Sequence, residues 1–234
     1  MVRIAFDKEL ALAGHFLLRH LNREELRQLA ATTTLANYPP HGMIFQKGDP
    51  GSGMMAVLRG RVKICTHSVD GKELVLNIIG KGGVFGEIAL LDGEPRSADA
   101  FAAEETDLLV LERAQFLPFL SQHPDVTLRI IALLCQRLRQ TSEYLEDAMF
   151  LEAESRLARC LVRLSRAFGK PDGQGTRIDI KLSQQQLGNL IGLSRESVNK
   201  YLGEWQRDGV IEMANGFITL RDPAALDGLA GAAA

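Results

Sequence analysis

The stretch FGEIALLDGEPRSA, residues 85–98, places an acid, a base and a hydroxyl around a short helical segment. Gly86 allows another part of the chain to approach closely, and the residues after it can form one helical turn whose free amides attract an anion. Arg96 offers a planar fork for a phosphate, and Ser97 adds a hydroxyl donor. Glu87 would repel a phosphate but suits a ribose hydroxyl, as acidic residues do in dinucleotide sites. The stretch predicts a small-nucleotide site, with a surface salt bridge between Glu87 and Arg96 as the alternative.

The residues on either side of this stretch are typical of a β-barrel or β-roll. Glycine is frequent from 37 to 117, and short β-type runs lie between the glycines at 54–58, 61–66, 74–79 and 107–111. Asp70-Gly71, between two of these runs, indicates a hairpin. Several short strands separated by glycine turns predict an all-β barrel or roll. Residues 1–36, which precede it, predict helices, one of them starting at the capping residue Asn22.

Residues 124–151 are the longest periodic segment of the chain. Pro124 suits the first turn of a helix, which would be about 40 Å long at about 1.5 Å per residue. The inward positions are spaced alternately by three and four residues, as in the seam of a coiled coil. These positions are Ile131, Leu134, Leu138, Thr141, Leu145 and Ala148. The period favours a seam between two helices of a dimer over a helix packed on its own barrel, and the Thr141 hydroxyl can set the register or face a ligand.

Residues 152–222 are compact and rich in helix signals. Ser183 and Gln186 form a capping box that opens a helix, and Gly192 ends that helix. Ser194 then caps the next helix. Two helices joined by so short a turn predict a helix-turn-helix.

The second of these helices has one apolar and one polar half. On a helical wheel of about 100° per residue, the apolar side chains gather on one side. They are Val198, Tyr201, Leu202 and Trp205. The other side carries types that read base edges, since Arg or Lys suits guanine, Glu suits cytosine and Asn suits adenine. These are Arg195, Glu196, Asn199 and Lys200. Their crowding at the start of the helix favours a DNA-reading helix over an ordinary solvated face.

Length and composition bound the remaining possibilities. The chain has 234 residues and a formal net charge of −2, so any DNA contact must come from a local patch. Three cysteines without a CxxC pair argue for a reducing, cytoplasmic setting. The first residues lack the apolar core of a signal peptide and no apolar run approaches transmembrane length, so neither a signal peptide nor a transmembrane helix is expected. The histidines have no metal-ligand spacing and no nucleophile elbow is present, so no metal, no cofactor and no enzyme activity are expected. A loop is expected at 171–175 and a frayed tail from 222 onward.

Residues 85–98 resemble the phosphate-binding cassette of cyclic-nucleotide-binding domains, in which Gly-Glu, an apolar and a small residue are followed by Arg, a small residue and Ala. The resemblance implies a β-roll in which Glu87 holds the ribose 2′-hydroxyl, while Arg96 and Ser97 hold the cyclic phosphate. The implied contacts are Gly86, Glu87, Ile88, Ala89, Arg96 and Ser97, with Leu76 and Ile79 beside the ribose and base.

Two further segments resemble one family. GLSRESVNK, residues 192–200, is similar to the recognition helix of the cyclic-AMP receptor protein family of bacterial transcription factors. RLRQTSE, residues 137–143, resembles the dimer helix of that family, which implies that Thr141 and Ser142 meet the adenine, the serine reaching from the partner subunit. Lys200 departs from the family pattern, which has Arg there, and Lys is a point charge and not a planar fork.

The chain is identified by these motifs as a member of the cyclic-AMP receptor protein and fumarate-nitrate regulator family. The resemblance implies an α+β fold, with a β-roll sensor domain at 1–123, a dimerisation helix at 124–151 and a winged helix-turn-helix domain at 152–234. It implies a dimeric transcription regulator under the control of cyclic AMP or, alternatively, cyclic GMP. The implied partners are a DNA palindrome with TGTGA-like half-sites and, for an activator, RNA polymerase. Ser183 and Ser194 join Arg195, Glu196, Asn199 and Lys200 as implied DNA contacts.

Other hypotheses remain open within and outside this family. The chain could act without a ligand or with another effector, or it could be a regulatory subunit of an enzyme, against which the recognition helix argues. Cys65-Thr-His67 has the spacing of the haem ligands of the carbon-monoxide-sensing branch but lies well before the cassette. Packing of Cys65 in a strand and a surface position for His67 are therefore preferred. The chain lacks the cysteine cluster of the iron–sulfur branch.

Overall fold

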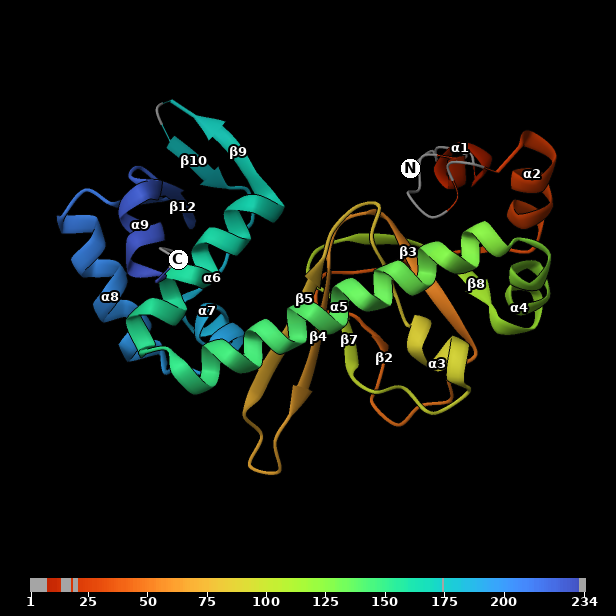
Figure 1. The fold of residues 1–234 in the computed structure, drawn as a ribbon, viewed down its shortest axis with the longest axis horizontal. Helices are drawn as coiled ribbons and strands as arrows, with labels where there is room; N and C mark the ends of the chain where they lie inside the picture. The colour runs from red at the N-terminus through yellow and green to blue at the C-terminus, as the bar shows by residue number, and fades with distance from the viewer. Residues whose placement is uncertain (1–7, 14–17, 19–20, 174, 232–234) are drawn as a thin grey trace. The chain divides into compact units, whose positions relative to one another are not determined.

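The computed structural model describes residues 8–13, 18, 21–173 and 175–231. The chain divides into two compact units, the first formed by residues 1–67 and 76–138 and the second by residues 68–75 and 139–234. Figure 1 labels the helices and strands of both units.

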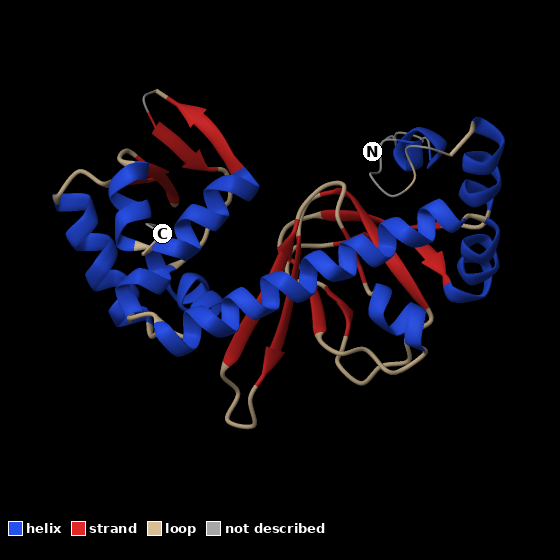
Figure 2. Ribbon diagram, viewed as in Figure 1, coloured by secondary structure: helices blue, strands red, loops and turns tan. Residues whose placement is uncertain are grey.

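The first unit is built on two four-stranded sheets (Figure 2). One sheet has the strand order β1-β8-β3-β6 and the other has the order β2-β7-β4-β5. The strands are β1 (Thr34–Tyr38), β2 (Met43–Phe45), β3 (Gly53–Arg59), β4 (Val62–His67), β5 (Glu73–Ile79), β6 (Val84–Phe85), β7 (Asp99–Ala102) and β8 (Thr106–Glu112). The first three residues of β5, 73–75, are assigned to the second unit. Apolar side chains from both sheets share one core, among them Val57, Phe85 and Leu108 from the first and Val62 and Ala100 from the second.

The four predicted strand runs are confirmed as β3, β4, β5 and β8. The hairpin predicted at Asp70-Gly71 is also present, because β4 and β5 are neighbours in their sheet and Gly71 takes a left-handed φ of 79°. The fold is the predicted α+β class, with a sheet domain, a long helix and a helix-turn-helix along the chain.

Helices α1 (Lys8–Ala13) and α2 (Arg23–Ala31) precede the sheets. The predicted cap is confirmed, because the Asn22 side chain accepts a hydrogen bond from the Glu25 amide and the Glu25 carboxylate accepts one from the Asn22 amide. The prediction that residues 1–36 are helical is wrong at its end, where Thr34 starts β1. This strand pairs with β8, with Thr34 opposite Val110, so a partner far along the chain overrides the local signal. Residues 1–7, 14–17 and 19–20 of the predicted helical segment lie outside the described residues.

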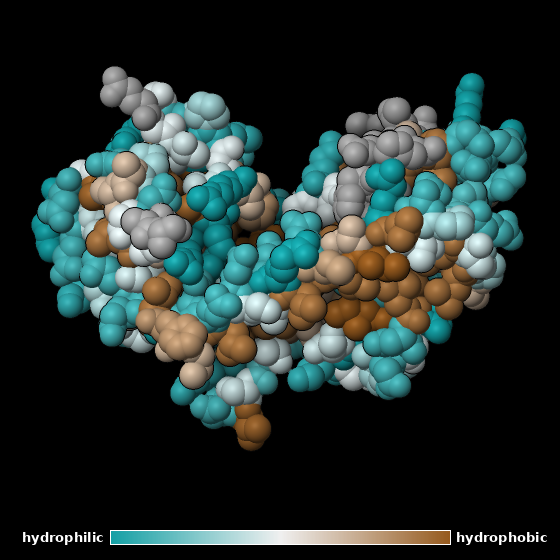
Figure 3. Space-filling view, viewed as in Figure 1, coloured by the Kyte–Doolittle hydropathy of each residue, from teal (hydrophilic) through white to brown (hydrophobic). Residues whose placement is uncertain are grey.

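Helix α3 (Glu87–Asp92) follows β6, and α4 (Arg113–Gln122) leads into the long helix α5 (Pro124–Phe150), which confirms the helix predicted at 124–151. One side of α5 packs into the core of the first unit, where Val126 and Ile130 are buried against side chains of α4. The side with the predicted seam is largely exposed, and Leu138 and Leu145 are 69% and 63% exposed. Figure 3 shows apolar side chains gathered along the N-terminal half of α5.

The second unit contains a helix-turn-helix and a four-stranded sheet of order β11-β12-β10-β9. Its elements after α5 are α6 (Ala153–Phe168), β9 (Gly169–Asp172), β10 (Gly175–Ile178), α7 (Gln184–Ile191), α8 (Arg195–Arg207), β11 (Ile211–Ala214), β12 (Phe217–Leu220) and α9 (Pro223–Leu229). The buried carboxylate of Asp147, near the end of α5, forms ion pairs with Arg159 and Arg163 of α6. These pairs hold the start of this unit against α6.

Two local predictions in this unit are wrong. Within 171–175, where a loop is expected, Pro171 and Asp172 belong to β9 and Gly175 to β10, with Thr176 opposite Pro171, and residue 174 lies outside the described residues. Of the tail expected to fray from 222 onward, Pro223–Leu229 form α9, because Asp222 caps the helix and Leu226 is buried, and residues 232–234 lie outside the described residues. Both segments are ordered because they pack against the rest of the unit. That packing depends on residues far along the chain, so it could not be predicted from these short stretches alone.

Across the part of the chain that the structure describes, no helix combines the length and the apolar character that a membrane crossing requires.

We expect Leu202→Ala to destabilise the second unit by about 2–5 kcal/mol, because the side chain is fully buried and its loss leaves a cavity. The single tryptophan, Trp205, is also buried in this unit, so its fluorescence during urea unfolding reports on this unit. Lys200→Ala, an exposed position of the same helix, is the matched control and should leave the midpoint nearly unchanged. Equal midpoints for the two variants would contradict the packing described for α8.

Candidate functional site

The cassette begins where β6 ends and α3 begins. Gly86 lies between them with a φ of 77°, a left-handed conformation that glycine adopts without steric cost. A Cβ at this position would lie 2.6 Å from Nη1 of Arg96 and 3.3 Å from the carbonyl oxygen of Gly53. Glycine is therefore required both by the turn and by the close approach of Arg96, as predicted for a backbone that packs tightly at this point.

Arg96 is held in place from three directions. Its Nη1 donates a hydrogen bond of 2.8 Å to the Gly86 carbonyl, and its guanidinium lies 4.3 Å from the centre of the Phe45 ring. Its own amide donates to the Asp49 carbonyl, while its carbonyl accepts from the Gly48 amide. Burial lowers the pKa of Arg96, and the nearby carboxylates of Asp49, Glu112 and Glu87 act in the opposite direction. The result is a fixed, largely desolvated cation.

Glu87 is the second charged group of the cassette, and its side chain is buried, with 1% exposed. Arg137 of α5 donates one hydrogen bond to Oε1 of Glu87 and another to the carbonyl of Val84. The alternative of a direct Glu87–Arg96 salt bridge on a surface loop is not what the structure has, because Glu87 pairs with Arg137. Arg137 is not among the residues predicted from the sequence, because only the fold brings this arginine of α5 to Glu87.

Two polar atoms of this cassette have no hydrogen-bond partner among the described residues, although both are buried. They are Oε2 of Glu87, an acceptor, and Nε of Arg96, a donor. Buried polar atoms are almost always satisfied in folded proteins, so such a pair calls for an explanation. An acceptor and a cationic donor in one cavity suit a ligand that carries both a hydroxyl and an anionic group.

Both side chains line a cavity of about 70 Å³ in the first unit. The predicted residues that line it are Gly86, Glu87, Ile88, Ala89, Arg96 and Ser97, and the further lining residues are Phe45, Ile64, Phe85, Ala98 and Arg137. Leu76 and Ile79 are not part of this lining. Leu76 is exposed and Ile79 belongs to the core of the roll. Thr141 and Ser142 are exposed on α5 and do not line this cavity either.

The helix-turn-helix has the predicted signals at its ends. The Ser183 hydroxyl accepts a hydrogen bond from the Gln186 amide, and the Gln186 side chain accepts one from the Ser183 amide. Gly192 ends α7 with a left-handed φ of 68°, and the Ser194 hydroxyl caps α8 by accepting from the Ser197 amide. These contacts confirm the capping pattern read from the sequence, and they show that both serine hydroxyls already support the helices.

The two faces of α8 are also as predicted. Val198, Leu202 and Trp205 are buried, and Tyr201 is half-buried. The four polar residues Arg195, Glu196, Asn199 and Lys200 are all exposed. The Gln184 side chain of α7 donates a hydrogen bond of 3.0 Å to Oδ1 of Asn199, which orients that amide.

Glu196 has a structural reason for its place in the first turn of α8. Hydrogen bonds from its own amide and from the Ser194 side chain lower the pKa of the Glu196 carboxyl, with a smaller contribution from Arg195. The carboxylate is thus directed toward the positive end of the helix dipole.

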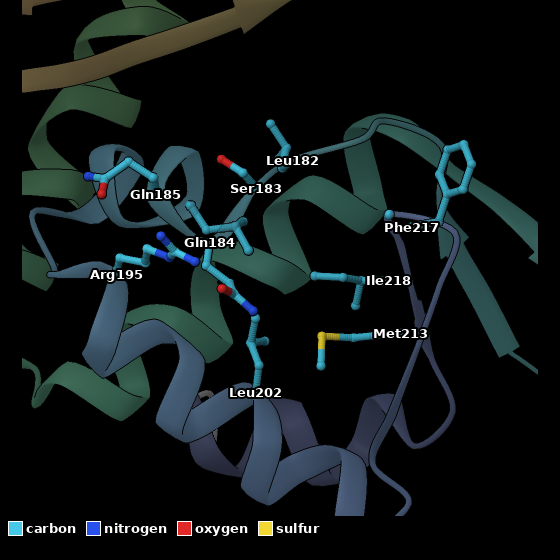
Figure 4. Close-up of a pocket in the computed structure, with 11 residues that line it drawn as sticks. Leu182, Ser183, Gln184, Gln185, Arg195, Leu202, Met213, Phe217 and Ile218 are labelled. Carbon is cyan, nitrogen blue, oxygen red and sulfur yellow. The ribbon is translucent and has the colours of Figure 1, made fainter.

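A depression of about 540 Å³ lies between the helix-turn-helix and the β11–β12 hairpin (Figure 4). Arg195 and Gln184 line it from the helices, and Met213 and Ile218 line it from the hairpin. The apolar part of its lining includes Leu202 of α8 and the hairpin residues Met213 and Ile218. The polar part includes Arg195, which also belongs to the exposed face of α8.

Comparisons with known proteins match both units of the chain. A family model for the cyclic nucleotide-binding domain matches residues 35–123, and one for the Crp-like helix-turn-helix domain matches residues 155–229. The cyclic AMP receptor protein of Thermus thermophilus is 35% identical over 193 residues, which is 82% of this chain and 86% of that protein. The chain belongs to the CRP/FNR family of transcription regulators.

Two further members of the CRP/FNR family show how broadly the similarity extends. A CRP-like cAMP-activated global transcriptional regulator of Mycobacterium tuberculosis is 29% identical over 216 residues, covering 92% of this chain and 96% of that protein. The structure of a c-di-GMP-responsive global regulator from Xanthomonas campestris has 27% identity and a TM-score of 0.72, over 85% of this chain and 99% of that one. This CRP/FNR protein is therefore a transcription regulator with a cyclic-nucleotide-binding domain and a DNA-binding helix-turn-helix, and not an enzyme.

We expect Gly86→Ala to displace the Arg96 guanidinium, because the added Cβ would lie 2.6 Å from its Nη1. Gly82→Ala is the matched control, since Gly82 has a φ of 82° but no heavy atom within 4 Å of the added Cβ. Both variants incur the strain of a left-handed alanine, about 1 kcal/mol. Only Gly86→Ala should lose further stability in thermal unfolding and cyclic-nucleotide affinity in calorimetric titration. Equal losses for both would mean that the contact with Arg96 is unimportant.

Proposed function

We propose that this regulator binds cyclic AMP in the cassette cavity and, as a homodimer, binds a palindromic DNA site in response. The observation that supports the nucleotide most strongly is the pair of buried, unsatisfied atoms, Oε2 of Glu87 and Nε of Arg96. In the proposed complex the ribose 2′-hydroxyl donates to Glu87, and the cyclic phosphate accepts from Arg96 and Ser97. Cyclic AMP is preferred because relatives that cover most of the chain are cAMP-activated regulators.

The base would be read from the long helix. By resemblance to the family, Thr141 and Ser142 contact the adenine, the serine from the partner subunit. Both residues are exposed on α5. Cyclic GMP is the alternative ligand, because Ser97 and Thr141 hydroxyls can hydrogen-bond to either nucleotide.

Dimerisation is supported by the exposed apolar side of α5. Leu138 and Leu145 lie on the predicted seam, and each would be buried by a second copy of the helix. Burying a leucine contributes about 1.5–3 kcal/mol, so a seam with several such residues can hold two chains together. Leu134 is different, because it packs partly on the core of its own unit. One side of α5 therefore packs on its own unit, and the neighbouring side carries the proposed dimer seam.

Control of DNA binding would pass through Glu87. Its partner Arg137 lies on α5, the helix that carries the seam. A ligand that also binds the Glu87 carboxylate would therefore be coupled to α5 through the Glu87–Arg137 ion pair. A ligand that binds one arrangement of the paired helices better shifts the dimer toward it. In that arrangement the two recognition helices would lie about 34 Å apart, one turn of DNA. The short connection between Phe150 and Ala153 is the proposed hinge.

A second effector class has specific support. The similar regulator of Xanthomonas campestris responds to c-di-GMP, so membership of the family does not by itself select cyclic AMP. Titration with cyclic AMP, cyclic GMP and c-di-GMP separates these possibilities, and binding of none of them would favour a ligand-independent regulator. We place the regulator in the cytoplasm, with RNA polymerase as a partner if it activates transcription.

Arg96→Leu should lower the affinity for cyclic AMP at least tenfold, because it leaves the phosphate without its charged partner, a loss of about 2–5 kcal/mol. Isothermal titration calorimetry measures the affinity, and circular dichroism checks the fold. Arg61→Leu is the matched control, since Arg61 pairs with Glu104 outside the cavity. An unchanged affinity in folded Arg96→Leu would remove the cassette from the proposal.

Leu138→Lys combined with Leu145→Lys should convert the dimer to monomers, because four like charges would meet along the proposed seam. Analytical ultracentrifugation measures the mass, and DNA binding should fail with it. The control combines Ala132→Lys with Gln136→Lys, which adds the same charge at exposed positions on the opposite side of α5. A double seam variant that stays dimeric would place the dimer contact elsewhere.

Arg195→Ala should cost about 1–3 kcal/mol in DNA affinity and relax the preference at one base pair, because a bidentate guanine contact is lost. The measurement is a binding titration on a TGTGA-type palindrome and its single-base variants at two salt concentrations. Arg207→Ala, an exposed position in the last turn of the same helix, should leave the sequence preference intact. If Arg195→Ala weakens binding equally on every sequence with a smaller salt slope, Arg195 contacts only the backbone.

A further inference from the structure

Three side chains of metal-ligating types meet in the first unit, away from the cassette cavity. Sγ of Cys65, a ring nitrogen of His67 and a carboxylate oxygen of Asp99 all lie within 4.8 Å of one another. Cys65 and His67 come from β4, and Asp99 comes from β7, its neighbour in the sheet. In the described part of the chain, no other group of three or more His, Cys, Asp or Glu side chains lies close enough together to hold one ion.

The strand register explains why these residues meet. Cys65 and Asp99 are direct partners in the β4–β7 ladder, so their side chains stand next to each other on one face of the sheet. His67 lies two residues after Cys65, and alternation along a strand puts it on that same face. The juxtaposition is thus a property of the paired strands and not of a mobile loop.

The carboxylate of Asp99 is already oriented as a ligand. Its Oδ2 forms a hydrogen bond of 2.9 Å with Nδ1 of His67, and a bound ion would replace that bond. Its Oδ1 accepts a hydrogen bond of 2.7 Å from the Lys47 amide. Metal-bound carboxylates are commonly held by such an outer hydrogen bond. Asp99 is buried and Cys65 fully so, whereas the His67 side chain is 41% exposed. An ion could therefore enter from the side of His67.

We propose that Cys65, His67 and Asp99 bind a zinc ion, with a water molecule as the fourth ligand. Zinc takes thiolate, imidazole and carboxylate ligands at about 2.0–2.3 Å, which puts the ligand atoms about 3.3–3.8 Å apart in a tetrahedron. The ligand atoms lie at most 4.8 Å apart. The widest pair would have to close by about 1.0–1.5 Å to reach this arrangement, while the hydrogen-bonded His67 and Asp99 atoms would open slightly. One thiolate and one carboxylate would also balance the charge of the ion.

A chain of hydrogen bonds connects the proposed zinc site to the nucleotide cassette. Asp99 holds the Lys47 amide, and the next two residues of that loop, Gly48 and Asp49, hold the main chain of Arg96. The zinc site is nevertheless separate from the cavity, since none of Cys65, His67 and Asp99 lines it.

The test uses Co²⁺ as the probe on the reduced, metal-free full-length protein, followed by absorption spectroscopy. We expect saturable binding of one ion per chain, a thiolate-to-cobalt charge-transfer band, visible bands of tetrahedral intensity, and displacement by Zn²⁺. Cys65→Ser should abolish the charge-transfer band. Cys135→Ser and Cys160→Ser are the matched controls and should retain it, because both cysteines lie outside the group.

His67→Gln and Asp99→Asn keep the test decisive if Cys65→Ser does not fold. Each should weaken Co²⁺ binding at least tenfold, and His67→Gln changes a partly exposed side chain that the fold tolerates. His41→Asn, at an exposed turn with a left-handed φ of 64°, should bind as the wild type does. The proposal is overturned if no saturable binding occurs, if the band depends on Cys135 or Cys160, or if folded His67→Gln and Asp99→Asn both bind Co²⁺ with unchanged affinity.

Discussion

The buried carboxylate of Glu87 is the constraint around which the sensor unit is built. An isolated charge in the interior is costly, and it is retained only where a partner of opposite charge and good geometry compensates for the lost water. Arg137 provides that partner from α5, and it also donates to the carbonyl of Val84. The start of the cassette and the long helix are therefore connected through one carboxylate. Within the described part of the chain, its second oxygen has no hydrogen-bond partner, so that oxygen can serve a ligand.

Arg96 shows the complementary constraint. Its guanidinium is desolvated between Phe45 and the Gly86 carbonyl, and its main chain is clamped by the loop at Gly48 and Asp49. A cation fixed in this way loses little freedom on binding an anion, which favours affinity through preorganisation. The cavity of about 70 Å³ is smaller than a typical small-molecule site of about 300–1,000 Å³. When a nucleotide binds, side chains at the open side of the cavity must therefore move, or other groups must complete the site.

The features that could be predicted from the sequence are those encoded by neighbouring residues. The caps at Asn22, Ser183 and Ser194 depend on residues within one helical turn, and the amphipathic faces of α8 follow from its period. The cassette was found because its glycine, acid and arginine lie close together in the sequence. The resemblance to a known family then supplied the order of the units.

The features that could not be predicted depend on tertiary pairing. Thr34 belongs to a strand because it pairs with β8, and the residues near Thr34 do not predict that pairing. Arg137 is one of several arginines on α5, and only the fold brings it to Glu87. Asp99 meets Cys65 and His67 through the register of β4 and β7, so the Cys-x-His spacing along the chain did not indicate the third residue of the group. Leu76 is exposed and Ile79 packs in the core of the roll, and their contact with a nucleotide stays a prediction.

The central claim is that a nucleotide bound at Glu87 and Arg96 controls DNA binding, and thermodynamic linkage tests it directly. The affinity of the full-length protein for a TGTGA-type palindrome would be measured with and without saturating cyclic AMP, and its affinity for cyclic AMP with and without the saturating palindrome. We predict that each ligand raises the affinity for the other by the same factor, about 5–150-fold. Cyclic AMP that binds the cassette while leaving the DNA affinity unchanged would contradict the account.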